Sequence, residues 1–505
     1  METIERVDTK AGRREWIALG VLALPLLLVS MDVSVLYFAV PFISADLGAT
    51  ATEQLWIFDI YGFVLAGLLI TMGALGDRIG RRRLLLAGAV AFGVASLAAA
   101  YAQSPEQLIA ARAVLGIGGA TLMPSTLALI RNLFTDPAQR SKAIAFWSAV
   151  MMAGISLGPV LSGVLLEHFW WGSVFLINLP AMVLLVVLAP VLLPEFRPAS
   201  AGRFDLVSSV LSLAAVLPLI YGIKKLAADG AGVVPAGGIV LGVVVGIVFV
   251  RRQQRRADPM IELAMFRNRA FSAAIVANTV AAFGVIGNAV FLTQYLQLVR
   301  GMSPLTAALW SLAPSVAVAG AAPAASALAQ RVARSRVIAL GFGIGAAGFA
   351  VISQVHAHSP LVLVLVGAGV LAAGLVMVMT LVTEVVVGTV TPERAGSASA
   401  LTETCSEFGG ALGIAILGSI GAAAYRSHLH GALPTGVPGD AAEAAREGLP
   451  GAVAVADRLP GALGDALLAA GRDSFSHSMD VVAVVGAVLL VATAGLVVAL
   501  VPRRS

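Results

Sequence analysis

The sequence predicts an all-α, polytopic membrane protein with fourteen membrane-spanning helices, arranged as two six-helix bundles with a two-helix hairpin inserted between them. Composition is the first reason: 59% of the 505 residues are hydrophobic, 12% are charged and the mean hydropathy is +0.93. These values lie outside the usual profile of a soluble domain. The second reason is the recurrence of long apolar runs, and the third is the gathering of basic residues in alternate loops.

Each apolar run between charged or Pro/Gly breaks is long enough to cross a bilayer, which takes about 20 residues as a helix. The predicted first bundle spans residues 16–40, 55–75, 84–102, 106–130, 143–167 and 174–193. The inserted hairpin is predicted at 206–223 and 236–251. The second bundle is predicted at 271–296, 305–328, 335–354, 360–387, 396–424 and 479–501.

The distribution of positive charge tests this count. With the N-terminus inside, 25 of the 33 Lys and Arg residues fall in inner segments and 7 in outer ones, including Lys224 and Lys225, while Arg112 lies within a span. Short positively charged loops stay on the cytoplasmic side, and a missed helix would spoil the separation. We therefore expect a multi-pass protein of the bacterial cytoplasmic membrane with both termini cytoplasmic.

The chain then divides into parts of predictable character. A weak internal repeat supports two equivalent halves, because 327–336 aligns with 74–83, although chance similarity of alanine-rich sequence is an alternative. In the long outer loop at 425–478 we expect a lid or a partly ordered hairpin over the outer mouth, with short helices at 441–449 and 461–471. The predicted parts are a cytoplasmic tail (1–15), the first bundle (16–193), the hairpin (204–251), a cytoplasmic linker (252–270) and the second bundle (271–501) with an extracellular loop (425–478).

Five ionisable residues lie well inside the predicted spans: Asp32, Asp59, Arg112, Glu403 and Glu407. Glu384 is near the inner end of its span, where an acid is expected to reach the interface. Each costs roughly 2.5–3.5 kcal/mol to insert, so such residues usually face a cavity and have a function. The first three fall in the outer half of the first bundle. An acid beside Arg112 could exchange its ion pair for a proton, as a proton-coupled carrier requires; a static ion pair is the alternative.

Glu403 and Glu407 are spaced i, i+4 and share one helix face. Two neighbouring acids are hard to ionise together, so they could bind a proton, a cation, or each in turn. Aromatic faces attract cations as well, although packing or an interfacial position would explain each ring equally. The candidate aromatic contacts are Trp56, Tyr61, Trp147, Phe283 and Tyr295.

A glycine-rich basic loop joins the second and third predicted spans. It reads GALGDRIGRRR over residues 73–83 and holds Gly73, Asp77, Arg78, Gly80, Arg81 and Arg82. Glycines let two helix ends approach closely, and Asp77 is expected to pair with the arginines and to cap the helix that begins near Leu84. The segment resembles the signature loop of the major facilitator superfamily. This resemblance implies that the loop stabilises the state that is closed on the inner side. The alternative is a generic basic turn, which would need only the arginines.

The fifth predicted span carries a second pattern, GISLGPVLSG over residues 154–163. Gly154 and Gly158 at i and i+4 make a smooth face for close helix contact, and Pro159 bends the helix. With Gly163, the pattern resembles the G-x-x-x-G-P-x-x-G-G motif of the exporter branch of that superfamily. Ser162 replaces the first glycine of the final pair, and an ordinary packing face is the alternative.

Further segments narrow the resemblance. LVSMD ending at Asp32, followed by Ala39-Val40-Pro41, is similar to the first span of the fourteen-helix drug:proton antiporters, and Arg112 stands in a segment like their fourth span, with Leu115 where glutamine is usual. WIFDIY over 56–61 and the Glu403/Glu407 pair resemble the group of LfrA-, QacA- and SmvA-type exporters, LfrA-type members most. The tenth span lacks the acid that QacA has there.

The resemblance implies export of lipophilic cations by alternating access, in exchange for protons: dyes, quaternary ammonium compounds and, as a further class, fluoroquinolones. Proton coupling would fall to Asp32, Arg112 and Glu407, and substrate binding to Asp59, Glu403 and Glu407 with the aromatic residues. A dedicated exporter of one antibiotic or metabolite is the alternative. We expect a monomer in the lipid bilayer, no enzyme activity, no cofactor, no metal and no nucleic-acid partner; the single cysteine excludes an internal disulfide.

Overall fold

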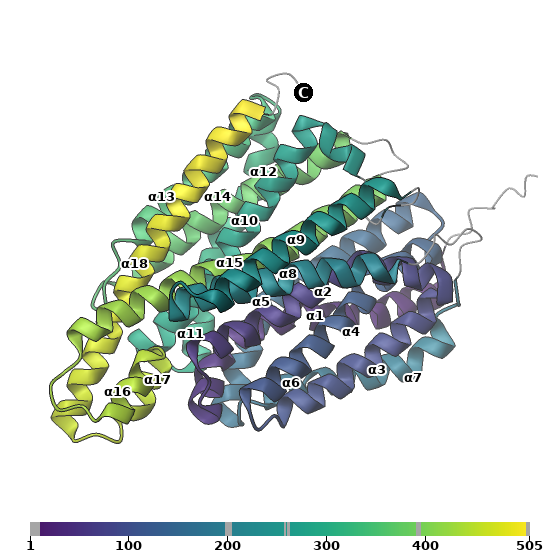
Figure 1. The fold of residues 1–505 in the computed structure, drawn as a ribbon. Helices are drawn as coiled ribbons and strands as arrows, with labels where there is room; N and C mark the ends of the chain where they lie inside the picture. The colour runs from purple at the N-terminus through teal and green to yellow at the C-terminus, as the bar shows by residue number, and fades with distance from the viewer. Residues whose placement is uncertain (1–10, 197–204, 257–258, 260–262, 390–394, 501–505) are drawn as a thin grey trace, which may run out of the picture.

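The computed structural model describes residues 11–196, 205–256, 259, 263–389 and 395–500, and every regular element in these ranges is a helix (Figure 1). Fourteen helical segments of the described chain are long and apolar enough to cross a membrane. The predicted fold class is thus confirmed. Residues 1–10 of the predicted tail, parts of the predicted linker and residue 501 lie outside the described residues.

The first bundle is made of long helices that pair α1 with α5, α4 with both α2 and α3, and α3 with α7. Its sixth span is divided into a single turn, α6, and a longer helix, α7. The bounds are α1 Arg13–Leu47, α2 Ala51–Ile79, α3 Arg81–Ala100, α4 Pro105–Leu133, α5 Pro137–His168, α6 Ser173–Leu176 and α7 Asn178–Leu192.

The second bundle pairs α10 with α14 and α15, and α13 with α14 and α18. Its first span ends in a π-helix, η2, and its second is divided into α11 and α12. The bounds are η1 Leu263–Arg267, α10 Arg269–Gln294, η2 Tyr295–Val299, α11 Pro304–Ser311, α12 Ala313–Ala329, α13 Arg334–Ile352, α14 Leu361–Gly388, α15 Ala395–Ala432 and α18 Gly461–Leu500.

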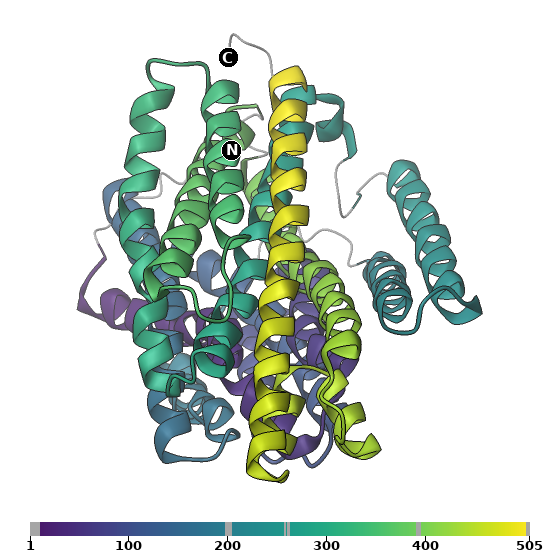
Figure 2. The same cartoon turned by 90° about the vertical axis from the view of Figure 1, so that its left-hand side faces the viewer.

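The inserted hairpin lies over the seam between the two bundles. It consists of α8 (Leu206–Asp229) and α9 (Val233–Arg255), and α8 packs against both α2 and α15. One small apolar cluster joins the three helices through Phe63, Ile220 and Ala415. Figure 2 shows the hairpin at the edge of the molecule, and few residues of α9 are buried.

The predicted outer loop is more helical than expected. α15 continues to Ala432, two short helices follow (α16 Gly439–Arg446 and α17 Leu449–Ala456), and α18 already begins at Gly461. The short helix predicted at 461–471 is therefore wrong as a separate element: it is the first part of α18. The polar residues that follow it interrupt the apolar run but not the backbone hydrogen bonds of the helix, which extends beyond the membrane.

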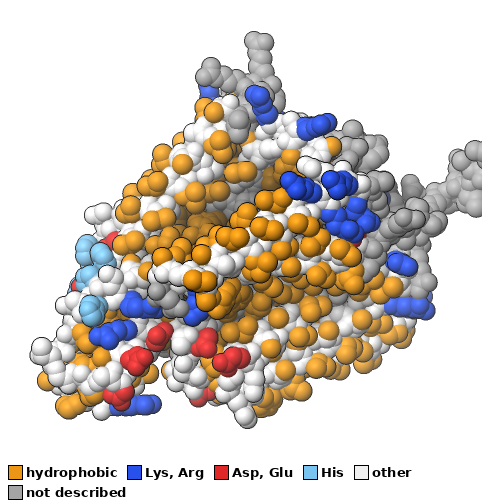
Figure 3. Space-filling view, in the orientation of Figure 1, with side chains coloured by type: hydrophobic (Ala, Val, Ile, Leu, Met, Phe, Trp, Pro, Cys, Tyr) orange, Lys and Arg blue, Asp and Glu red, His pale blue; other side chains and the backbone are white. Residues whose placement is uncertain are grey.

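The two bundles meet through their outer halves. A side-chain carbon on Gly163 of α5 would collide with the backbone of Leu305 on α11, and one on Gly62 of α2 would press on Ala411 of α15. Towards the other end, where the C-terminus lies, the helices of the two bundles diverge (Figure 1). Lys and Arg side chains gather at that end (Figure 3), the end that the sequence analysis expects to be cytoplasmic.

Candidate transport site

A buried ion pair joins the first and fourth spans. The Arg112 guanidinium on α4 donates a hydrogen bond to the Asp32 carboxylate on α1, and its Nε donates to the carbonyl of Ile57 at 3.0 Å. The Arg112 side chain is 0% exposed and that of Asp32 is 2% exposed. The Cζ atom of Arg112 lies 4.7 Å from the centroid of the Tyr61 ring. The structure thus brings together the acid and the arginine that the sequence singled out.

Glycines of α4 allow this arrangement. A side-chain carbon on Gly116 would collide with the Tyr61 carbonyl and Val64, and one on Gly119 would press on the Tyr61 ring. α2 and α4 can therefore approach closely enough for the ring of Tyr61 to lie beside the Arg112 guanidinium.

Glu403 and Glu407 lie on α15, in the opposite bundle, and both are partly exposed. The described residues place no Lys, Arg or His within ion-pair distance of either carboxylate. Glu407 lies within electrostatic range of Tyr37 and Tyr61 of the first bundle. Tyr61 also contacts Arg112, so it stands between the ionisable groups of the two bundles.

The structure corrects the predicted position of Lys224 and gives Asp59 a partner that the sequence analysis did not foresee. We expected Asp59 to be a substrate-binding acid and Lys224 to lie in an outer loop. α8 instead continues to Asp229, and Lys224 Nζ lies 2.6 Å from Asp59 Oδ2 with both side chains 0% exposed. A lysine can be buried at this depth because a carboxylate on a neighbouring helix neutralises it. Asp59 therefore already has a cationic partner in this structure.

The predicted aromatic residues are in different surroundings. The Trp56 ring receives the Lys224 ammonium at 4.2 Å from its centroid, and Trp147 donates to Thr126 Oγ1 at 3.2 Å. Phe283 is a buried core residue. Tyr295 is also buried and its hydroxyl donates to the His356 carbonyl at 3.0 Å, so it packs rather than offering a free aromatic face.

The glycine-rich basic loop is tighter than predicted. Gly80, with φ +110°, alone separates α2 from α3, which begins at Arg81 rather than near Leu84. Asp77 pairs with Arg81 at 2.5 Å from the last turn of α2, so the expected cap on the next helix is wrong. Gly73 lies at a partly exposed position of α2, and Arg78 is exposed.

Glu195, which the sequence analysis missed, holds this loop from beyond α7. It accepts a hydrogen bond from the Arg82 backbone at 3.1 Å and pairs with the Arg82 and Arg83 side chains at 3.8 Å. Arg82 Nη1 also donates to the Leu193 carbonyl at 2.9 Å. In this state the loop thus binds its own bundle. Glu195 could have been identified from the sequence, because it is an acid directly after the sixth span, at the same end of the bundle as the basic loop.

The glycine pattern of α5 lies against two partners. Side-chain carbons at Gly154 and Gly158 would collide with Ser30 and Ser34 of α1, and Gly163 faces α11. Pro159 lies inside α5, and Ser162 Oγ donates to the Val35 carbonyl at 3.0 Å. The pattern therefore joins α5 to its own bundle and to the other one.

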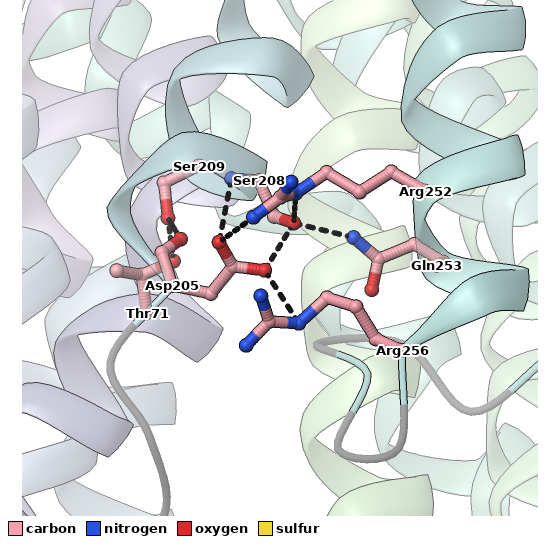
Figure 4. A network of polar contacts seen from close by, with 7 residues as sticks. All are labelled: Thr71, Asp205, Ser208, Ser209, Arg252, Gln253 and Arg256. Atoms are coloured by element: carbon pink, nitrogen blue, oxygen red, sulfur yellow. Dashed lines mark hydrogen bonds and ion pairs between the residues drawn. The ribbon is translucent and has the colours of Figure 1, made fainter.

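A polar network fixes the inner end of the hairpin, and the sequence analysis did not foresee it (Figure 4). Asp205 accepts from Arg252 at 3.0 Å, pairs with Arg256 at 3.1 Å, and accepts from Ser208. Thr71 of α2 and Ser209 of α8 share a hydrogen bond that joins the network to the first bundle. Burial alone would raise the pKa of Asp205, but the hydrogen bonds from Ser208 and Arg252 outweigh it and lower the pKa below its ordinary value.

A helical membrane protein with two bundles and ionisable side chains inside its spans has the architecture of a membrane transporter. The chain belongs to the major facilitator superfamily, whose family model matches residues 22–414. The described residues contain no cluster of His, Cys, Asp and Glu suited to a metal ion.

Named relatives extend along nearly the whole chain. It is 44% identical to the multidrug efflux pump LfrA of Mycolicibacterium smegmatis, with 97% of each chain covered. It is 34% identical to the methyl viologen resistance protein SmvA of Salmonella typhimurium, covering 96% of this chain and 98% of that one. A crystal structure of a bacterial homologue of the human lysosomal transporter Spinster, in an inward-facing and unoccupied conformation, has the same fold: TM-score 0.65, 18% identity, and 96% and 97% of the two chains covered.

Proposed function

We propose that this protein is a drug-efflux transporter that exports lipophilic cations across the bacterial cytoplasmic membrane in exchange for protons. The relatives named as a multidrug efflux pump and as a methyl viologen resistance protein support the efflux of drugs and of cationic compounds. The proposed substrates include dyes and quaternary ammonium compounds, in which a delocalised or shielded positive charge is carried on an apolar body.

The observation that carries the proposal is the contrast among the intramembrane acids. Asp32 and Asp59 are in buried ion pairs, whereas Glu403 and Glu407 are partly exposed and have no ion pair among the described residues. A carboxylate without a resident cation can take either a proton or a substrate cation, and competition between the two couples their movements. Because Glu407 lies within electrostatic range of Tyr37 and Tyr61, we assign to it the coupling with the Asp32–Arg112 pair.

The transport cycle follows from alternating access. The bundles rock about the midplane site; in this structure they meet through their outer halves. A proton entering from outside would release the cation there, and the protonated carrier would return to face the cytoplasm. The protein acts as a monomer in this scheme, because each bundle supplies one part of the site.

The test is ethidium movement in proteoliposomes under an imposed pH gradient. We expect the wild type and the exposed-acid control Glu443→Gln to move ethidium against its gradient, and Glu407→Gln to lose this movement. Full transport by Glu407→Gln would refute the coupling role. A folded wild-type protein that moves no ethidium would refute cation export and favour a dedicated exporter of a single antibiotic or metabolite.

A further inference from the structure

The acid and aromatic face on α2 already hold a cation that the chain itself supplies. Lys224 Nζ lies 2.6 Å from Asp59 Oδ2 and 4.2 Å from the centroid of the Trp56 ring. A carboxylate beside a tryptophan face is the arrangement by which proteins bind lipophilic ammonium compounds. Lys224 arrives there from the inserted hairpin, since α8 crosses beside α2.

The hydrogen bonding of the buried Lys224–Asp59 pair is incomplete. An ammonium has three donors, yet beyond the ion pair the described residues supply no hydrogen-bond partner to its Nζ or to either oxygen of Asp59. A buried ion pair gains little net stability when its remaining hydrogen-bonding capacity is unsatisfied. A lysine ammonium is also strongly hydrated, so its burial is costly. A larger, delocalised cation would give the same charge and ring contacts with a smaller loss of hydration.

The Lys224 ammonium can move towards the end of α8 when a substrate cation displaces it. α8 ends at Asp229, five residues further on, which is about 7–8 Å along the helix axis at a rise of 1.5 Å per residue. A lysine stem is long and flexible enough to carry its ammonium over part of this distance, towards the membrane interface, while its methylene groups stay in apolar surroundings. The exchange therefore needs rotation of one side chain and no unfolding of α8.

We infer that Lys224 is a specificity-determining residue: it is an internal competitor that occupies Asp59 and Trp56 until a lipophilic cation replaces it. Only cations that bind this site better than the tethered ammonium are accepted, and strongly hydrated small ammonium ions are rejected. The inference rests on the proposed function, since it assumes that lipophilic cations are the substrates.

Equilibrium binding of ethidium to the purified full-length protein tests this role, with fluorescence as the readout. In Lys224→Met we expect ethidium to bind about tenfold more tightly or better, because a charged competitor of a close buried pair is removed. The double variant Asp59→Asn/Lys224→Met should lose this gain, since the freed carboxylate is what the ethidium uses. Lys224→Arg keeps a tethered cation and should show no gain.

Folding is checked by size-exclusion profile, and Lys224→Gln replaces Lys224→Met if the latter is misfolded, because its amide can still donate to Asp59 without a charge. Unchanged or weaker ethidium binding in the folded variant would overturn the inference. A gain that persists in the double variant would overturn it as well, because Asp59 would not be the site.

Failure of this inference is distinct from failure of the proposed function. A wild type that moves ethidium under a pH gradient while Lys224→Met binds it no more tightly overturns only the role of Lys224. A wild type that neither binds nor moves ethidium overturns the proposed function, and the inference with it.

Discussion

Removing Arg112 should destabilise the protein more than removing both members of its ion pair. In Arg112→Met the Asp32 carboxylate, 2% exposed, is left without its cation. Breaking a buried pair from one side costs about 3–5 kcal/mol. The variant also loses the hydrogen bond to the Ile57 carbonyl and the contact with the Tyr61 ring, the latter being worth about 2 kcal/mol when desolvated.

Two companion variants separate charge from packing. Asp32→Leu/Arg112→Met leaves no unpaired charge, so its loss is limited to the contacts of Arg112 with Ile57 and Tyr61. Asp32→Asn keeps those contacts and an oxygen that can accept from Arg112, but it leaves the buried guanidinium without its counter-charge. Its loss should therefore be smaller than that of Arg112→Met, which loses the contacts as well.

The assay is thermal unfolding of the purified variants in one detergent, followed by fluorescence-detected size exclusion. The expected order of melting temperature is wild type highest, the double variant and Asp32→Asn between, and Arg112→Met lowest. An Arg112→Met protein as stable as the wild type, or no less stable than the double variant, would refute the picture of a desolvated pair.

Three further changes test other parts of the structure, each by melting temperature in detergent. Gly158→Val should lower the free energy of unfolding by about 1–3 kcal/mol, because the added side chain overpacks against α1. Gly20→Ala should not lower it, because Gly20 has open space around it. Equal effects of the two substitutions would contradict the close α1–α5 contact. Glu195→Gln should cost less than about 1 kcal/mol, because its partners Arg82 and Arg83 are 28% and 66% exposed; a large loss would contradict this. Asp205 has a lowered pKa, so it adds stability above the ordinary carboxyl pKa near 4 and loses it as pH falls through its own lower value. The difference between wild type and Asp205→Asn should therefore be constant from about pH 8 to 5 and shrink below about pH 4; a difference that grows towards low pH would contradict the sign.

Much of the fold could be predicted from the sequence because a bilayer limits the possible structures: long apolar runs become helices, and basic loops fix their direction. The same reasoning placed Asp32 and Arg112 at similar depth in the first bundle, where the structure joins them. It failed where a charge was taken as the end of a span. Lys224 was placed outside for that reason, although α8 continues beyond it.

The missed contacts depend on partners far apart in the sequence. Asp59 lies eight residues from the start of α2 and Lys224 five from the end of α8, so their similar depth was a readable signal, but no rule of periodicity placed those two helices side by side. The same holds for Asp205 and Arg252, whose pairing depends on how the hairpin closes. Span counting gives depth and direction; lateral neighbours come only with the packed structure.

Proton release on substrate binding tests most directly the claim that a cation and a proton compete for Glu407. Ethidium would be added to the purified protein in weakly buffered solution near neutral pH while the pH is recorded. The account predicts proton release by the wild type and by Glu443→Gln, and none by Glu407→Gln. Ethidium binding to the wild type without proton release, or equal release by Glu407→Gln, would contradict it.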